Sequence, residues 1–286
     1  MRKPSFVGQF YTDDLENLEK EIKLCFKSVF GPGALPEKRG NKKIFGGVVP
    51  HAGYMFSGPC ASFFYKYVAE SKAVDAFVIL GVNHHGIGNK IAISLDDWST
   101  PFGLVKNEKT LGSKLMKKES IRNNEEMHSA EHSIEVQLPF LQFAYKDDLK
   151  KLKIIPILLS RLSYEECKKL AEDLVETLGK NICVIASGDF THYGPNFDYA
   201  PFSDNIKKNM EKIDIEAVKL IENLNTQDFL EYCKDKTICG TLPIAVCMEM
   251  MKKIGCRRGR LLRYYSSGDI TKDYSNSVGY ASILFE

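Results

Sequence analysis

The run Ala76-Phe77-Val78-Ile79-Leu80 is apolar throughout and leads into Gly81-Val82-Asn83-His84-His85-Gly86. A short apolar run without alternating polar residues is typical of a strand that is buried on both faces of a parallel sheet. The glycines after it favour a sharp turn of the backbone. This stretch therefore predicts a central strand that ends in a turn carrying histidine.

Three further runs have the same character, at residues 44–49, 154–159 and 182–186. Helical patterns lie between the runs, with apolar residues three and four positions apart at residues 59–70 and 164–178. Strands that alternate with helices predict an α/β fold of three layers, in which a central, mostly parallel or mixed sheet lies between helices.

The two ends of the chain carry further patterns. An amphipathic helix is expected from Asp13 onward, and residues 30–43, rich in Gly, Pro and Lys, are expected to form a surface loop. The last third is expected to contain helices at residues 213–224, 226–234 and 243–254 and strands at 260–265 and 277–285.

Composition excludes several classes of protein. The 286 residues include 39 Lys+Arg and 37 Asp+Glu, a net charge of +2, which is too balanced for a nucleic-acid-binding surface. No apolar run approaches the ~20 residues that cross a bilayer, and no signal segment follows Met1. With 44% hydrophobic residues and no repeat or linker, residues 1–286 are expected to form a single cytoplasmic domain without membrane or nucleic-acid partners.

Three of the predicted strands run into loops that contain histidine. His51 follows the run at residues 44–49, His84 follows the run at 76–80, and His192 follows the run at 182–186. In an open α/β sheet, functional groups collect outside the carboxyl ends of the strands, so parallel strands would bring these loops together. A hydrogen-bonded structural role is the alternative for any one of these histidines. Three in the same position predict a metal site, because imidazole is a common metal ligand.

A fourth segment, His128-Ser129-Ala130-Glu131-His132, matches the inverted zinc-protease signature H-x-x-E-H. That signature would place His128 and His132 on one face of a helix. Pro139 would interrupt such a helix, so a zinc-dependent hydrolase that uses His128, Glu131 and His132 is the least favoured function. His128 is expected at the surface, and His132 is expected to line the pocket as a hydrogen-bond donor.

None of the eight cysteines forms a C-x-x-C pair, and reduced, buried thiols are expected. Cys239 differs because it precedes a helix whose start is marked by Thr241 and Pro243. A helix N-terminus favours the thiolate, which is the form that binds metal. The alternative for Cys239 is a small buried residue.

Five motifs occur in one order along the chain. They are Pro50-His51-Ala52-Gly53-Tyr54, Asn83-His84-His85, Glu131-His132-Ser133-Ile134-Glu135 with Gln137-Leu138-Pro139-Phe140, Ser187-Gly188-Asp189-Phe190-Thr191-His192, and Thr237-Ile238-Cys239-Gly240 with Pro243. Together they resemble the Memo family (mediator of ErbB2-driven cell motility), which is found from archaea to animals. The resemblance covers nearly the whole chain, and the many lysines suit an archaeal member.

The resemblance implies a fold similar to that of the class III extradiol dioxygenases and a pocket at the histidine loops. By motif, His51, His84 and Cys239 would be the metal ligands. His192 would move protons as a catalytic residue, and Asp189 and His132 would line the same pocket. The dioxygenases place a carboxylate where this chain has Cys239, and a soft thiolate shifts the preference toward copper or zinc. The expected cofactor is a divalent or redox metal ion, with iron or copper before zinc.

Two functions of different classes follow. One is a metal-binding, dioxygenase-like redox enzyme. The other is a non-catalytic module that keeps the pocket and binds a small molecule or a peptide, with Tyr54, Phe56 and Tyr193 forming a recognition groove. The resemblance implies both, because animal members are described as metal-dependent redox proteins and as binders of phosphorylated receptor peptides.

Overall fold

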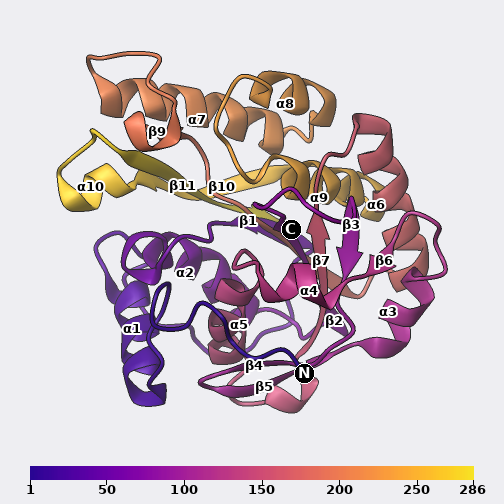
Figure 1. Ribbon diagram of the computed structural model, residues 1–286. Helices are drawn as coiled ribbons and strands as arrows, with labels where there is room; N and C mark the ends of the chain where they lie inside the picture. Colours follow the sequence, from indigo (N-terminus) through magenta and orange to yellow (C-terminus); the bar gives the residue numbers. More distant parts are fainter.

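One mixed sheet runs through the protein and carries helices on both faces (Figure 1). The structure is a computed structural model that describes all 286 residues. The strands are β1 (Gly46–Val49), β2 (Ala76–Val82), β3 (Ile91–Ile93), β4 (Trp98–Thr100), β5 (Gly103–Asn107), β6 (Arg122–Asn123), β7 (Lys153–Leu159), β8 (Ile182–Ser187), β9 (His192–Tyr193), β10 (Gly259–Ser266) and β11 (Ser277–Phe285).

The α-helices are α1 (Leu15–Lys27), α2 (Tyr54–Glu70), α3 (Lys109–Leu115), α4 (Glu125–Ser129), α5 (Leu138–Ala144), α6 (Tyr164–Leu178), α7 (Ile206–Glu222), α8 (Thr226–Cys233), α9 (Thr241–Ile254) and α10 (Ser267–Thr271). Short 3-10 turns lie at η1 (Glu135–Gln137), η2 (Leu149–Lys151) and η3 (Pro195–Phe197). None of the helices is both long enough and apolar enough to span a membrane.

The strand order β10-β11-β1-β8-β2-β7-β3-β6 confirms the predicted mixed sheet. Its centre is parallel, because β8 pairs in parallel with both β1 and β2, and β2 with β7. The closing pair β10 and β11 is antiparallel, and β11 runs antiparallel to β1. All four apolar runs predicted as strands lie in this parallel centre.

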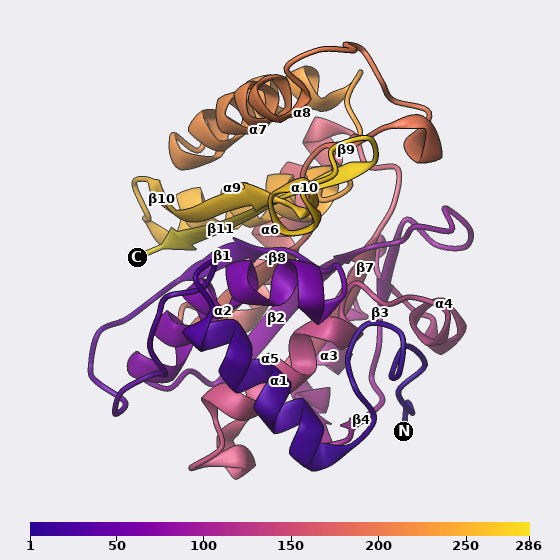
Figure 2. The ribbon, with the colours of Figure 1, turned by 90° about the vertical axis from the view of Figure 1, so that its left-hand side faces the viewer.

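The two faces of the sheet bury two separate cores. Val78 and Leu80 of β2 pack into the core beneath α6 and α9, whereas Phe77 and Ile79 pack on the other side, against α2 and α5. This alternation follows from the two-residue period of a strand. The cores contain 39 and 34 buried residues, so both faces are covered to a similar extent, which explains why the central strands are apolar throughout. Figure 2 shows these layers edge-on, with α7 and α8 outermost on one side and α1 on the other.

Most predicted helices form with nearly the predicted bounds, but α7 begins at Ile206 instead of residue 213, and α2 also begins early. The sequence pattern places the start of this helix at Pro59, but the helix begins at Tyr54 and Pro59 lies inside it. Tyr54 is anchored by tertiary contacts, since its backbone N–H donates to Phe10 and its hydroxyl donates to the carbonyl of Val136 at 2.6 Å. These contacts hold the residues before Pro59 in the helix, although proline has no backbone N–H and cannot make its own helical hydrogen bond. Residues 30–43 contain no helix or strand, as predicted.

Candidate metal centre

The parallel strands bring the histidine loops to one rim of the sheet. His51 lies two residues after β1, His84 two residues after β2, and Asp189 two residues after β8. Because β1, β8 and β2 are neighbours and run in the same direction, the three loops begin side by side. The predicted meeting of these loops is therefore what the fold produces.

Cys239 reaches this rim from the loop before α9. The loop runs against the segment after β8, where Thr191 pairs with Ile238 as an isolated antiparallel bridge. At the closest approach, a Cβ atom on Gly188 would lie 2.2 Å from the Cα atom of Gly240. Only glycine allows this contact, and the contact brings the sulfur of Cys239 to the histidine loops.

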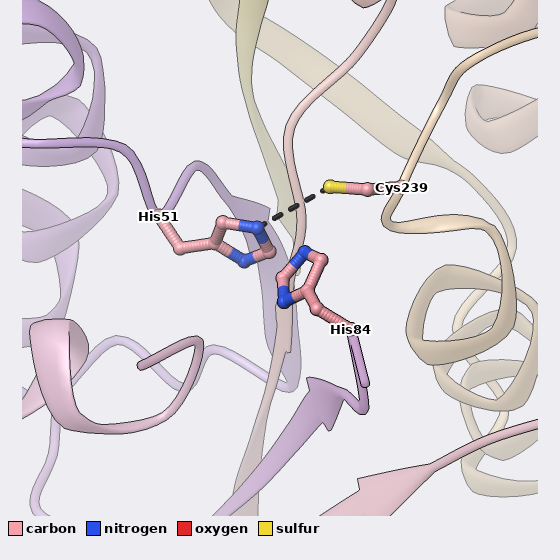
Figure 3. A group of neighbouring side chains, drawn as sticks. All are labelled: His51, His84 and Cys239. Carbon is pink, nitrogen blue, oxygen red and sulfur yellow. Dashed lines mark hydrogen bonds between the residues drawn. The ribbon is translucent and has the colours of Figure 1, made fainter. Parts of the chain in front are cut away.

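Three donor atoms converge at this place (Figure 3). The Nε2 atom of His51 lies 3.3 Å from the sulfur of Cys239, and the ring centroids of His51 and His84 are 5.1 Å apart. One ligand atom from each residue lies within 4.8 Å of the other two. A point within about 2.8 Å of all three atoms therefore exists, which is near the 2.0–2.3 Å bonds of a shared ion.

The hydrogen bonds of His51 leave its Nε2 atom free to bind a ligand. Its Nδ1 atom lies 3.1 Å from the hydroxyl oxygen of Ser187. The Ser187 hydroxyl donates its single hydrogen to the carbonyl of Ser133 at 2.5 Å, so its oxygen must accept from His51. Nδ1 therefore carries the proton, and the lone pair of Nε2 faces Cys239. His51 is 2% exposed, and burial, followed by the charge of His84, lowers the pKa of its ring well below the ordinary range.

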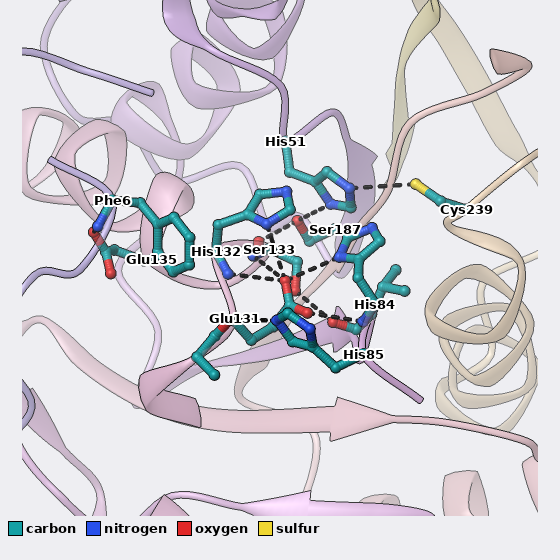
Figure 4. A network of polar contacts seen from close by, with 12 residues as sticks. Phe6, His51, His84, His85, Glu131, His132, Ser133, Glu135, Ser187 and Cys239 are labelled. Atoms are coloured by element: carbon teal, nitrogen blue, oxygen red, sulfur yellow. Dashed lines mark hydrogen bonds and ion pairs between the residues drawn. The ribbon is translucent and has the colours of Figure 1, made fainter. Parts of the chain in front are cut away.

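Glu131 orients His84 in the same way. The Nδ1 atom of His84 lies 3.0 Å from Oε1 of Glu131, and the backbone N–H of His84 donates to Oε2 at 2.8 Å (Figure 4). Burial acts to raise the pKa of Glu131, but the hydrogen bond and charge of His84, with smaller contributions from His132 and Ser133, hold it well below its usual range. The ionised carboxylate accepts only, so Nδ1 of His84 donates and Nε2 is the nitrogen left to bind a metal ion. In the sequence Glu131 belongs to the protease signature and to one motif of the family resemblance, and neither predicted this role.

His132 lies beside the two ligand candidates. Its ring stacks on that of His84 with centroids 4.7 Å apart and an interplanar angle of 11°, and Phe10 stacks on its other face at 4.4 Å. Burial, followed by the charge of His51, lowers the pKa of His132 to about 3. His132 is therefore a neutral ring that lies beside both His51 and His84.

Asp189 and His192 lie on the β8 side of the site. The Oδ1 atom of Asp189 accepts from the backbone N–H of His51 at 2.8 Å, and burial raises the pKa of this carboxyl. The Nδ1 atom of His192 lies 2.9 Å from the carbonyls of both Phe190 and Thr237, so it carries the proton and Nε2 is an acceptor. Neither residue belongs to the group of converging ligand atoms.

The protonation of Cys239 differs from the expectation. Its position before α9 suggests a thiolate favoured by the helix, yet burial, together with the charge of Asp189, raises the pKa of this thiol well above the ordinary range. The helix begins only at Thr241, and the sulfur contacts the backbone of Asp189 instead, accepting from its N–H at 3.2 Å. The protein alone therefore holds a neutral thiol, and a bound cation would be needed to stabilise the thiolate.

The protease signature does not form a site. Helix α4 ends at Ser129, so His128 and His132 do not share a helical face. His128 is fully buried, which corrects the expectation of a surface residue, and its Nε2 atom lies 3.0 Å from the carbonyl of Ala92. The backbone leaves the helix because Glu131 turns back to accept the N–H groups of His132 and Ser133.

Two of the three residues of the predicted aromatic groove are buried, and the third, Phe56, is partly exposed. Tyr54 and Tyr193 are 3% and 4% exposed, and the Tyr193 hydroxyl donates to the carbonyl of Phe202. Both rings belong to the protein interior because their hydroxyls find backbone acceptors there. The rings of Phe6 and Phe10 pack against His132, and the ring of Phe197 packs against His192.

Asp214 of α7 supports the loop that carries His192. It is fully buried and accepts from the backbone N–H and hydroxyl of Thr191, at 3.1 and 2.6 Å, and from the hydroxyl of Tyr264 at 2.8 Å. Burial raises the pKa of Asp214 to about 6, above the value of about 3.9 for an unfolded aspartate. Between these values the folded state binds more protons than the unfolded state.

The free energy of unfolding should therefore fall as the pH rises from 4 to 6.5, and the ionisation of Asp214 should account for about 2–3 kcal/mol of this decrease. Asp214→Asn keeps the shape and cannot ionise, so the variant should lack this decrease. Urea unfolding of both proteins across this pH range measures the difference. The prediction would be contradicted if the difference in free energy of unfolding between wild type and variant stayed the same at every pH.

Comparison with other proteins supports the resemblance found in the sequence. A profile of the family described as Memo-like protein matches residues 2–284. The chain is 39% identical to a MEMO1 family protein from Methanopyrus kandleri, over 99% of this chain and 98% of the relative. It is 38% identical to a MEMO1 family protein from Methanosarcina barkeri over the full length of both chains.

A solved structure of an uncharacterized protein from Escherichia coli K12 has a similar fold. Its TM-score is 0.54 at 12% identity, and the match covers 78% of this chain and 91% of the other. This likeness concerns the arrangement of helices and strands alone. The family itself follows from the match over residues 2–284 and from archaeal relatives that align along the whole chain: the protein belongs to the Memo family.

Proposed function

We propose that this protein is a metal-binding, dioxygenase-like redox protein in which His51, His84 and Cys239 hold the ion. The observation that carries the proposal is the convergence of their three donor atoms within 4.8 Å. Both imidazoles have their second nitrogen fixed by a hydrogen-bonding partner, as metal-ligating histidines do. The donor set fits a transition-metal ion, since it combines two neutral imidazoles with one thiol that can ionise.

The neighbouring residues suit proton transfer at the same site. An iron or copper ion bound here would supply one-electron chemistry, and zinc is the third candidate. His192 presents Nε2 as a proton acceptor because its Nδ1 proton is held by two carbonyls. Asp189 fixes the backbone of His51, and His132 supplies a neutral ring at the wall, so a bound small molecule would meet these three residues.

The test is the metal content of untagged protein, purified without chelators and measured by elemental mass spectrometry. The wild-type chain should retain close to one transition-metal ion, whereas His51→Ala and Cys239→Ser should each retain less than about a tenth of it, because each removes one of three ligands. His85→Ala is the matched control, since His85 is exposed and its Nε2 atom bonds to the carbonyl of Ala130. Unchanged metal content in both ligand variants would refute the proposal.

A second function is favoured by one observation, the stacking of Phe10 and the packing of Phe6 on His132. These rings form an aromatic wall beside the histidines, which a non-catalytic module could use to bind a peptide or a small molecule. Oxygen uptake by the metal-loaded protein with catechols separates the two functions. Multiple turnover excludes the inert module, and ligand binding without turnover excludes the enzyme.

A further inference from the structure

His84 belongs to two groups of potential ligands. Besides His51 and Cys239, it lies with Glu131 and His132 in a second group whose ligand atoms are also within 4.8 Å of one another. This second group could hold another ion, with His84 between the two. Alternatively, Glu131 binds no ion itself and instead orients His84 toward the ion held by His51, His84 and Cys239.

The hydrogen bonds of Glu131 distinguish these two roles. Its Oε1 atom accepts from the backbone N–H groups of His132 and Ser133, at 2.8 and 2.9 Å, and from Nδ1 of His84 at 3.0 Å. Its Oε2 atom accepts from the backbone N–H of His84 at 2.8 Å. A carboxylate oxygen offers about two lone-pair sites, so Oε1, which Nδ1 of His132 also approaches to 3.2 Å, has none left, whereas Oε2 keeps one. The side chain of Glu131 is only 1% exposed, and four hydrogen-bond donors already stabilise its carboxylate, which favours the positioning role.

The same contacts tie both histidines to one carboxylate. Glu131 holds His84 through its ring and its backbone, and it contacts His132 through its backbone N–H and through Nδ1, which lies 3.2 Å from Oε1. It therefore sets the stacking of the two rings, whose centroids are 4.7 Å apart. A hydrogen bond to Nδ1 makes Nε2 of His84 the better donor, because the carboxylate fixes the tautomer and raises the basicity of the ring.

We propose that Glu131 is a positioning residue that orients Nε2 of His84 toward the metal and fixes the spacing between His84 and His132. The inference rests on the proposed metal site. It assigns to the H-x-x-E-H segment a role in holding the ligand histidine, in place of hydrolysis.

The experiment loads the wild-type chain, Glu131→Ala and Glu131→Gln with Co²⁺ alone. The control is Glu125→Gln, because Glu125 also accepts backbone N–H groups, from Leu95 and Asp96, yet contacts no histidine. Competition with a chromophoric chelator gives the affinity, and the near-ultraviolet thiolate-to-cobalt band reports Cys239. Proton NMR detects exchangeable, hyperfine-shifted imidazole N–H signals, one from each ligating histidine.

Wild type and Glu125→Gln should show two such signals, from His51 and His84. Glu131→Ala should bind Co²⁺ ~10–100-fold more weakly and lose the His84 signal while the His51 signal, held by Ser187, remains. Glu131→Gln keeps an amide oxygen as an acceptor and should restore part of the affinity. If the alanine variant does not fold, the glutamine variant decides, since it should still bind about tenfold more weakly than wild type.

Three outcomes overturn the inference. Unchanged affinity with both N–H signals in folded Glu131→Ala shows that Glu131 does not orient His84. Two Co²⁺ ions in the wild type, with one lost in Glu131→Ala, make Glu131 a ligand of a second ion. If the wild type itself shows no thiolate-to-cobalt band, the proposed metal site is refuted. This failure differs from failure of the Glu131 role because it is seen in the protein without any substitution.

Discussion

Glu135→Ala is expected to lower the free energy of unfolding by about 3–5 kcal/mol, because it leaves the guanidinium of Arg2 as an unpaired buried charge. The two side chains are 4% and 0% exposed, and Nη1 of Arg2 lies 2.5 Å from Oε2 of Glu135. The carboxylate also accepts from the N–H groups of Ser5 and Phe6 and from the hydroxyl of Tyr11, each at 2.9 Å. The substitution therefore removes the acceptor for four donors at once.

The effect should reach the candidate metal centre. Arg2 also donates to the carbonyls of His128 and Glu131, at 2.8 and 3.0 Å, and Phe6 and Phe10 pack against His132. Loss of Glu135 should therefore free the N-terminal segment from the wall of the site. Urea unfolding gives the stability, and hydrogen exchange should show loss of protection at residues 2–11.

The matched control is Glu126→Ala, which removes an exposed acid from the first turn of α4 and should cost no more than about 1 kcal/mol. The buried pair of Arg2 and Glu135 would not hold the N-terminal segment if Glu135→Ala lowered the free energy of unfolding by less than about 1 kcal/mol and left residues 2–11 protected from hydrogen exchange.

Gly188→Ala is expected to lower the free energy of unfolding by about 3 kcal/mol. The variant molecules that still fold should retain no metal. The added Cβ would lie 2.2 Å from Cα and 3.0 Å from the backbone nitrogen of Gly240, and backbone atoms cannot move aside as a flexible side chain can. Because Asp189 and Cys239 adjoin these two glycines, separating the segments moves the sulfur away from His51.

Thermal unfolding and elemental analysis check both parts of this expectation. Gly53→Ala is the control, since Gly53 lies two residues from His51 but its Cβ would find its nearest neighbour at 3.6 Å, an ordinary contact. A Gly188→Ala protein with wild-type stability and metal content would show that the approach of the two loops is not needed for the site.

Several features of the site could be predicted from sequence because they depend on local patterns. The four buried strands are short apolar runs, and their parallel pairing requires that the loops after them share a rim. His51 and His84 were found in this way, from their position after a strand. Cys239 was singled out from its place before a helix and from the resemblance, but burial, followed by the charge of Asp189, raises the pKa of its thiol instead of lowering it.

Other features depend on contacts between distant residues, which no local pattern shows. Glu131 and His84 are separated by 47 positions, and the bond between them forms only because the loops after β2 and α4 meet. His128 carries the same side chain as His132, yet it is buried against Ala92 because α4 ends between them. Pro59 lies inside α2 because Tyr54 is anchored to Phe10 and Val136.

The sequence by itself determined the α/β class, the parallel centre of the sheet, the rim where the histidines gather, and the family. These follow from side-chain periodicity and from short motifs, which act within a few residues. Only the tertiary structure decided which nitrogen of each histidine is free, which carboxylate holds His84, and how the sulfur of Cys239 reaches Nε2 of His51. Those outcomes depend on the packing of loops far apart in the chain, where hydrogen-bond geometry and the contact of Gly188 with Gly240 select one arrangement.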